Sequence, residues 1–215
     1  AVASLNEAPG AVSVMVDAAR RYGRELTLIA LGPLTNVALA LKEDASAIGR
    51  VGRVVAMGGA VDVPGNVTPT AEFNMNVDPE AAHRVLAAGL PLDIVPLDAT
   101  RQAVLPRAGM RATLGRTPGP VAARIQAFSE RGFRISHADG EAGMALHDPL
   151  AVAVAVDPSL VKWEAVRLAV GPDGETQRAG GAPNCRIAKA VDRERFIRLF
   201  LDRLCPPTIE RGASS

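Results

Sequence analysis

The chain has 215 residues, of which 48% are hydrophobic and 22% are charged, and its formal net charge is +1. This length suits one well-cored domain, and the composition is ordinary for a globular protein. The near-zero charge excludes a basic footprint for nucleic acid or an anionic membrane, and no apolar run is long enough to cross a bilayer.

Two further features of the composition narrow the class of protein. Aromatic residues are only 3% of the chain, so Ala, Val and Leu must build the core. Such a core favours helices packed on a parallel sheet over an aromatic-rich sandwich. Cys185 and Cys205 form neither a metal-binding spacing nor a disulfide framework. We expect no signal peptide and a reducing, cytoplasmic location.

Apolar periodicity and turn residues predict strands that alternate with helices. The expected strands are short apolar runs at Leu26–Leu31, Arg53–Met57, Leu92–Leu97, Trp163–Val170 and Cys185–Val191. The expected helices are Glu7–Tyr22, Leu34–Lys42, Pro79–Ala88, Pro106–Leu114, Pro118–Arg131, His147–Val156 and Asp192–Leu204. A polar, glycine-rich loop is expected at Gly132–Gly143. The alternation predicts a three-layer α/β fold with a mostly parallel open sheet, in one domain over residues 1–205 with a flexible tail at 206–215.

In open parallel sheets, ligands bind outside the carboxyl ends of the strands. Leu31, Met57 with the following Gly58-Gly59, and Asp98 fall at such ends. We therefore expect a binding site along this edge, formed partly by the loop that follows Met57.

The most informative segment in that loop is Gly65–Asp78, which reads GNVTPTAEFNMNVD. From Glu72 onward, polar and apolar residues alternate, as in an extended strand. Glu72 and Asn74 are then expected on one side, with Phe73 and Met75 anchoring the other. A carboxylate beside carboxamides suits a ligand rich in hydroxyl groups, because each hydroxyl needs both an acceptor and a donor. An ordinary solvated loop explains the same composition.

The sequence His147-Asp148-Pro149 also has two explanations. In the first, Asp148 only caps the helix, because Asp is a favoured helix N-cap and Pro a favoured first helical residue. Alternatively, Asp148 binds a metal ion or sugar hydroxyls, and His147 transfers a proton near neutral pH.

Other candidates have plainer explanations. His83 is expected at the surface, His137 in a solvated loop and Cys185 in the core. The chain has no phosphate-binding glycine loop, dinucleotide fingerprint or nucleophile elbow.

Four segments follow one another in a distinctive order: Leu31-Gly32-Pro33-Leu34-Thr35-Asn36, Met57-Gly58-Gly59, Asn66 with Ala71–Asn74 and Asp78–Ala82, and His147-Asp148-Pro149. Their order and spacing resemble the inosine-uridine-preferring nucleoside hydrolase family. The likeness continues through Leu97-Asp98-Ala99-Thr100 to the final helix, and so covers nearly the whole chain.

The resemblance implies a calcium-dependent enzyme, a homodimer or homotetramer, that hydrolyses the N-glycosidic bond of ribonucleosides to base and ribose. It implies that the Leu31 carbonyl and the Asp148 carboxylate bind calcium. It assigns the ribose hydroxyls to Asn66, Glu72, Asn74 and Asp148, the pocket wall to Met57, and the role of general acid toward the leaving base to His147. Carboxylates and carbonyls are the oxygen ligands that calcium prefers.

The chain departs from the family in one respect. The family's D-x-D-x-x-x-D-D segment, which supplies most calcium ligands and the general base, does not occur in these 215 residues. We expect the chain to begin roughly a third of the way into the family fold, without the first strands and with an exposed sheet edge. Two alternatives follow: a non-catalytic nucleoside- or ribose-binding remnant that can depend on a partner, or an O-glycosidase that uses Glu72 and Asp148.

Overall fold

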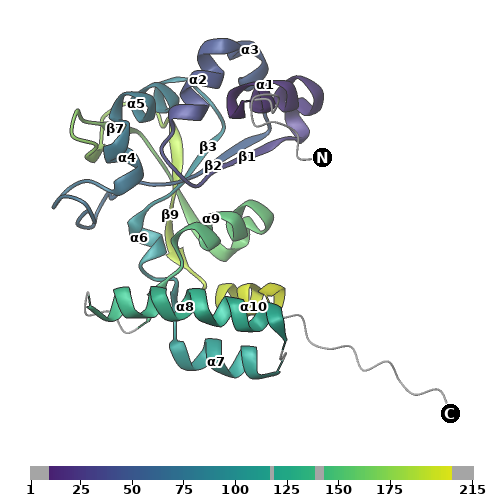
Figure 1. Ribbon diagram of the computed structural model, residues 1–215. Coiled ribbons are helices and arrows are strands. Elements are labelled where there is room, and N and C mark those ends of the chain that lie inside the picture. The colour runs from purple at the N-terminus through teal and green to yellow at the C-terminus, as the bar shows by residue number, and fades with distance from the viewer. Residues whose placement is uncertain (1–9, 117–118, 139–142, 205–215) are drawn as a thin grey trace.

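The centre of the molecule is a five-stranded sheet with the order β1-β2-β3-β9-β6. The computed structural model describes residues 10–116, 119–138 and 143–204 (Figure 1). Strands β1, β2, β3 and β9 are parallel, and β6 is antiparallel to β9. Two small antiparallel pairs, β4-β5 and β7-β8, lie outside this sheet. The prediction of a mostly parallel α/β fold is confirmed.

The strands are β1 (Thr27–Ala30), β2 (Arg53–Met57), β3 (Leu92–Val95), β4 (Val104–Leu105), β5 (Met144–Ala145), β6 (Val161–Val166), β7 (Leu168–Val170), β8 (Thr176–Arg178) and β9 (Cys185–Val191). The α-helices are α1 (Ala11–Tyr22), α2 (Thr35–Glu43), α3 (Ala45–Ile48), α4 (Phe73–Val77), α5 (Pro79–Ala87), α6 (Leu97–Thr100), α7 (Arg107–Arg116), α8 (Pro120–Ala138), α9 (His147–Val156) and α10 (Arg193–Leu204). Short 3-10 helices occupy Gly23–Glu25 and Pro158–Leu160.

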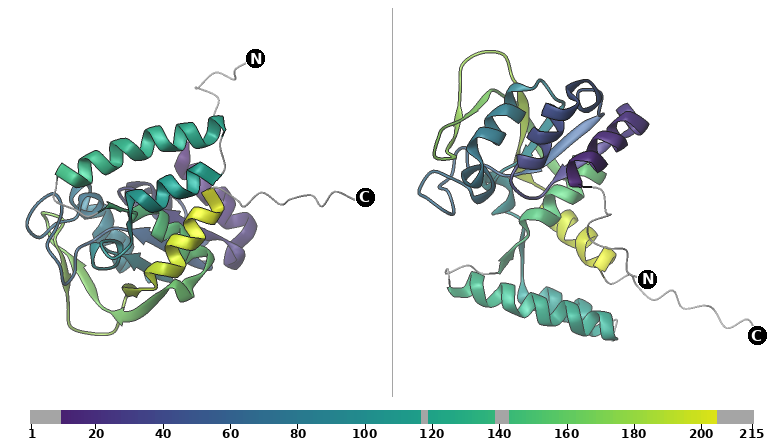
Figure 2. Two further views of the ribbon diagram at one scale, coloured as in Figure 1. Left: turned by 90° about the horizontal axis from the view of Figure 1, so that it is seen from below. Right: turned by 45° about the horizontal axis from the view of Figure 1, so that its top comes forward.

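Helices cover both faces of the sheet, and alternate side chains of β2 belong to different cores. Val54 and Ala56 are buried under α1, α2, α3 and α5 on one face. Val55 and Met57 are buried on the other face with residues of α6, α9 and α10. Figure 1 shows the two layers on either side of the strands, and Figure 2 shows α8 as an outer helix remote from them. This arrangement is the expected three-layer fold.

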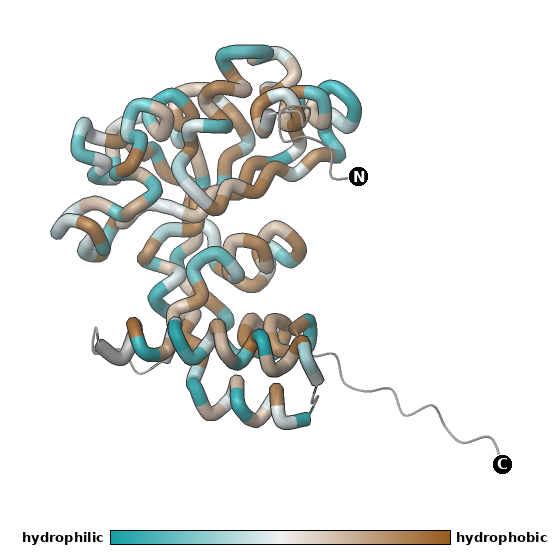
Figure 3. Tube along the Cα trace, in the orientation of Figure 1, coloured by the Kyte–Doolittle hydropathy of each residue, from teal (hydrophilic) through white to brown (hydrophobic). Residues whose placement is uncertain are grey.

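Strand β1 lies at the edge of the described sheet. Its side chains are only partly covered: Ile29 is 38% exposed, and Leu31 just beyond the strand is 40% exposed. Figure 3 shows apolar residues along the strands of the sheet, its edge strand β1 included. An open apolar edge of this kind is a template for pairing with another strand.

Local signals at the start of α5 behave as expected. Asp78 is the N-cap, its carboxylate accepts a hydrogen bond from the Ala81 amide, and Pro79 is the first helical residue. The predicted bounds of β2 and β9 are also confirmed. His83 is exposed and Cys185 is buried, both as predicted.

Two predictions of secondary structure were wrong beyond the main site. Gly132 to Ala138 continue helix α8, so most of the expected loop is helical, and residues 139–142 lie outside the described part. The expected strand Trp163–Val170 divides at Arg167 into β6 of the main sheet and β7 of a hairpin. His137 lies in the part of α8 whose side chains are not described. Among the described residues, no helix is long and apolar enough to span a membrane.

Candidate active site

The candidate residues gather at the carboxyl edge of the sheet. Ala30 of β1 is paired with Ala56 of β2, so Leu31 and Met57 follow at neighbouring strand ends. Thr100 belongs to α6, which begins one residue after Pro96 at the end of β3. Helix α9 packs against β1 and β2, with His147 as its first residue.

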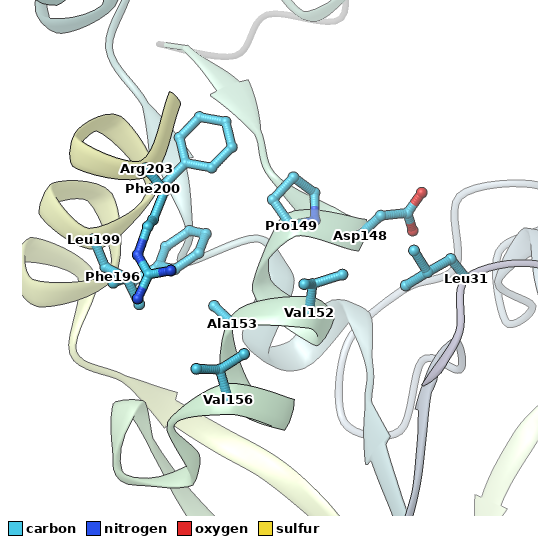
Figure 4. A pocket seen from close by; sticks show the side chains of 10 residues that line it. All are labelled: Leu31, Asp148, Pro149, Val152, Ala153, Val156, Phe196, Leu199, Phe200 and Arg203. Atoms are coloured by element: carbon cyan, nitrogen blue, oxygen red, sulfur yellow. The ribbon is translucent and has the colours of Figure 1, made fainter. Parts of the chain in front are cut away.

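Leu31 and Asp148 line the same groove. The groove has a volume of about 600 Å3 and is formed mainly by apolar side chains of α9 and α10. Figure 4 shows Asp148 and Leu31 near each other at one end, with Phe200 and Arg203 of α10 away from them. The structure therefore brings together the two residues that were expected to share a cation.

Asp148 is not a helix cap. The N-cap of α9 is Leu146, which makes no side-chain capping bond, and Asp148 lies within the first turn. Its side chain is exposed, yet desolvation by the surrounding atoms raises the pKa of its carboxyl group, while the nearby His147 lowers that pKa in part. A carboxylate that is desolvated in this way gains from a cation or from hydroxyl donors. The capping explanation was wrong, and the explanation as a binding residue stays a prediction.

His147 is held by the turn that follows β3. Its Nδ1 lies 2.7 Å from the hydroxyl of Thr100, which is completely buried. The hydrogen bond fixes the plane of the imidazole ring, and proton-transfer groups depend on such orientation by a second residue.

Glu72 is a buried helix cap. The expected extended strand from Glu72 was wrong, because residues Phe73–Val77 form helix α4 with Glu72 as N-cap. Its carboxylate accepts hydrogen bonds from the amides of Asn74 (2.9 Å), Met75 (3.2 Å) and Gly59 (3.0 Å). The bonds from Asn74 and Met75 satisfy the start of the helix, and the bond from Gly59 holds the carboxylate against the end of β2. Together they outweigh the preference of alternating residues for an extended backbone.

The change from strand to helix also alters which side chains are anchors. Phe73, expected as an apolar anchor, is 53% exposed, whereas Met75 is fully buried. Glu72 is 2% exposed, and the two oxygens of a carboxylate offer about four acceptor positions in all. Three of them are used by amides, so Glu72 has room for one further donor. This geometry disfavours Glu72 as the nucleophile of an O-glycosidase.

Asn74 and Asn66 hold the strand end and the loop to α4. Asn74 donates from Nδ2 to the carbonyl oxygen of Met57 at 3.1 Å and to its sulfur at 3.4 Å. Asn66 accepts a hydrogen bond from the Phe73 amide at 2.9 Å. Met57, Glu72 and Asn74 thus form one connected group, to which Asn66 is joined through the start of the helix.

The described residues do not form a complete calcium site. Among them there is no group of three or more His, Cys, Asp and Glu side chains able to hold a metal ion. Leu31 and Asp148 offer one carbonyl and one carboxylate, whereas calcium takes six to eight oxygen ligands. The donor set of this part of the chain is therefore insufficient on its own.

Comparison with known proteins decides the family. Residues 2–198 match the family described as inosine-uridine preferring nucleoside hydrolase. The chain belongs to this family. It is 34% identical over 211 residues to a pyrimidine-specific ribonucleoside hydrolase, RihA, of Shewanella sp. (strain MR-4), with 92% of this chain and 65% of the relative covered. The RihA of Salmonella agona (strain SL483) is 32% identical over 209 residues, with 90% of this chain and 66% of the relative covered.

Solved structures of nucleoside hydrolases share the fold. A purine-preferring ribonucleoside hydrolase from Gardnerella vaginalis superposes with a TM-score of 0.86 at 32% identity, covering 93% of this chain and 66% of that one. The plant nucleoside hydrolase PpNRh1 superposes with a TM-score of 0.85 at 31% identity, and 92% of this chain and 67% of that one are covered. The chain thus spans about 65% of the length of the curated nucleoside hydrolases it matches.

Sequence reasoning missed the supporting role of α6 in this chain. Asp98 was placed at the expected site edge without a partner, Thr100 was noted only as part of a segment after a strand, and Arg101 was not considered. Asp98 accepts hydrogen bonds from the amides of Val61 and Asp62, and Thr100 contacts His147. The one available signal was their position at a strand end on the expected site edge.

Proposed function

We propose that this chain carries the ribose- and base-facing part of a ribonucleoside hydrolase, which cleaves the N-glycosidic bond to release a base and ribose. The observation that carries the proposal is a placement at the carboxyl ends of neighbouring parallel strands in a chain of this family: Leu31 and Asp148 share a groove after β1, and the Met57–Glu72–Asn74 group follows β2. The named relatives act on pyrimidine or purine ribonucleosides, so the proposal covers ribonucleosides as a class.

Each residue has a role that its contacts allow. In the proposal Asn66, Glu72, Asn74 and Asp148 bind ribose hydroxyls, and Met57 forms the wall beside them. The remaining acceptor position of Glu72 suits one hydroxyl donor. Asn74 uses Nδ2 to hold Met57, which leaves Oδ1 for the ligand.

The reaction requires proton transfers at two places. The oxygen of a water molecule bonds to C1′ while the N-glycosidic bond breaks and its electron pair goes to the base nitrogen. His147, oriented by Thr100, supplies the proton that the leaving base takes. The water must lose a proton to a general base, and nearby carboxylates stabilise the oxocarbenium-like sugar.

We assign calcium as the cation, with Leu31 and Asp148 as two of its ligands. The remaining ligands and the general base are assigned to an acid-rich strand that pairs with the free edge of β1. Two features support this assignment: β1 is an exposed edge, and the groove beside it is apolar and contains Leu31 and Asp148.

A chimera tests the function. The amino-terminal segment of the Shewanella RihA that precedes the matched region is placed before Ala1, and ribose release from inosine and uridine is measured. We expect activity that chelation of calcium abolishes and added calcium restores. Asp148→Asn should lower the rate at least about 100-fold, while the surface control Glu80→Gln should leave it unchanged. A chimera that binds calcium but releases ribose from no purine or pyrimidine nucleoside would refute the enzyme proposal.

A second candidate is a ribose- or nucleoside-binding module without catalysis. It is favoured by the incomplete set of metal ligands in the described residues. Calorimetric titration of the 215-residue chain with ribose and inosine, with and without calcium, distinguishes the binding module from the hydrolase. Tight binding without turnover in both the chain and the chimera supports the module.

We also propose a cytoplasmic salvage enzyme that assembles as a homodimer or homotetramer. The thiol of Cys185 is free and buried, which suits a reducing compartment. Val121, Phe128 and Ile135 are exposed apolar side chains seven residues apart on α8, and such a row supports self-association. Sedimentation of the chimera gives its subunit number, and a monomer at micromolar concentration would contradict the oligomer.

A further inference from the structure

The loop between β2 and α4 carries Asn66 and is fixed by side chains from outside it. We call residues 60–71 the Asn66 loop. Backbone hydrogen bonds close its tip, where Gly65 donates to the Pro69 carbonyl and Asn66 donates to the Ala71 carbonyl. These bonds shape the tip, but they do not attach it to the body of the protein.

Arg101 makes the attachment near the tip. Its guanidinium donates to the carbonyl of Pro64 at 2.7 Å and to that of Gly65 at 2.9 Å, the two residues directly before Asn66. A guanidinium presents its donors in a fixed planar fork, so two bonds to successive carbonyls set both position and orientation. Arg101 is the C-cap residue of α6, directly after Thr100.

Asp98 attaches the beginning of the same loop. Its buried carboxylate accepts hydrogen bonds from the amides of Val61 at 2.9 Å and Asp62 at 3.0 Å. Lys189 of β9 lies 3.4 Å from Asp98 and 2.5 Å from Asp62, which ties the loop to the sheet. Arg178 also pairs with Asp62, at 2.8 Å.

The short helix α6 therefore contacts both parts of the candidate site. Thr100 holds His147, while Asp98 and Arg101 hold the Asn66 loop. We infer that Arg101 is a positioning residue: it holds Asn66 at the distance from His147 that ribose binding requires, and it touches no substrate itself. The inference rests on the proposed function for its effect on catalysis, but the attachment of the loop can be measured without activity.

Hydrogen–deuterium exchange in the 215-residue chain tests the attachment. Arg101→Ala should accelerate exchange of amides in residues 61–71 about tenfold, because hydrogen bonds to a charged group are lost. Arg101→Lys should restore part of the protection, since an ammonium group replaces only one arm of the fork. Arg50→Ala, which removes an exposed cation outside these contacts, is the matched control, and its amides in residues 61–71 should exchange as fast as those of the parent chain.

The chimera gives the functional measurement. Arg101→Ala should raise KM for inosine about tenfold and change kcat less than about threefold, because ribose binding is weakened more than the chemical step. The KM of Arg101→Lys should lie between that of the unmutated chimera and that of Arg101→Ala. An effect on kcat alone would contradict a role in positioning Asn66.

Three results would overturn the inference. These are unchanged exchange at residues 61–71, faster exchange across the whole chain, and local acceleration with unchanged KM in an active chimera. If the unmutated chimera binds calcium but is inactive, the proposed function fails, and the exchange data still decide whether Arg101 fixes the loop.

Discussion

The hydroxyl of Thr100 lies 2.7 Å from Nδ1 of His147, across 47 residues of sequence. Thr100 is fully buried in α6, at the end of β3, and His147 begins α9. The turn after one strand of the sheet thus orients the histidine that we assign to the leaving base. The contact joins two segments that the sequence presents as unrelated.

Replacing this hydroxyl should impair catalysis more than folding. In the chimera, Thr100→Val keeps the side-chain volume but releases the imidazole, and we expect kcat/KM for inosine to fall about tenfold, a part of the effect of a general acid. Thr100→Ser keeps the hydroxyl and should retain activity within about threefold. Steady-state kinetics of the chimera and its two variants tests this expectation, and thermal unfolding checks that all three are folded. Equal activity of the valine and serine variants would show that the contact serves packing only.

Asp78 should stabilise the fold through the hydrogen bonds that its ionised carboxylate accepts. It caps α5 through the Ala81 amide and accepts a hydrogen bond of 2.5 Å from the hydroxyl of Thr35 on α2. Removing the cap in Asp78→Ala should cost about 1–2 kcal/mol in the free energy of unfolding. Urea unfolding measures it. Glu80→Ala, which removes an exposed ion pair with Arg84, should cost less than about 0.5 kcal/mol.

The contribution of Asp78 should also depend on pH. The hydrogen bond from Thr35, and then that from the Ala81 amide, lower the pKa of its carboxyl group. A group with a lowered pKa stabilises the fold above its unfolded pKa of about 3.9, and the stabilisation is lost as the pH falls through the folded value. The difference between parent and Asp78→Ala should be full at pH 6 and shrink below about pH 4. Asp78→Asn still caps the helix but has no titrating carboxyl group, so its difference from the parent should be smaller than that of alanine and should shrink over the same pH range. A difference that does not change with pH for either variant would contradict this explanation.

Local signals in the sequence were enough for much of the fold. The bounds of β2 and β9 and the start of α5 follow from apolar runs, a capping Asp and a Pro at the first helical position. The place of Leu31 at the site edge follows from the rule for parallel sheets, and its neighbourhood with Asp148 was expected from the family resemblance. These features depend on neighbours along the chain or on fold topology, which sequence reasoning can reach.

Features that depend on distant partners were not reached. Helix α4 replaces the expected strand because Glu72 caps it and is itself held by the Gly59 amide, 13 residues away. The roles of Thr100 and Arg101 require partners 47 and 36 residues away. A pattern of period two cannot reveal such contacts, because they exist only once the sheet has assembled.

Asp93 should be among the most sensitive charged residues in the fold. Its carboxylate is 2% exposed and pairs with Arg53 at 2.6 Å and Arg186 at 2.7 Å. Arg53 also donates to the carbonyl of Val154 at 3.0 Å, near the end of α9. Asp93→Asn leaves the largely buried guanidinium of Arg53 and the half-exposed guanidinium of Arg186 without their counter-ion, and we expect a loss of about 3 kcal/mol, the lower end for a broken buried pair. Urea unfolding should show this loss, whereas Glu130→Gln, at the surface with Arg107 and Arg111, should change stability far less because solvent screens its ion pairs.

Gly65 should tolerate no side chain, because a Cβ there would overlap the backbone carbonyl oxygens of Thr68 and Ala71. Relieving the overlap means opening the tip of the Asn66 loop and losing its hydrogen bond to Pro69. We expect Gly65→Ala to destabilise the chain by about 1–3 kcal/mol, and to weaken ribose binding in the calorimetric titration. Gly109 in α7 is the matched control, since a Cβ there meets nothing within 4 Å. Gly109→Ala should stabilise the chain by about 0.5–1 kcal/mol through helix propensity, so equal effects of the two changes would show that the tip is not tightly closed.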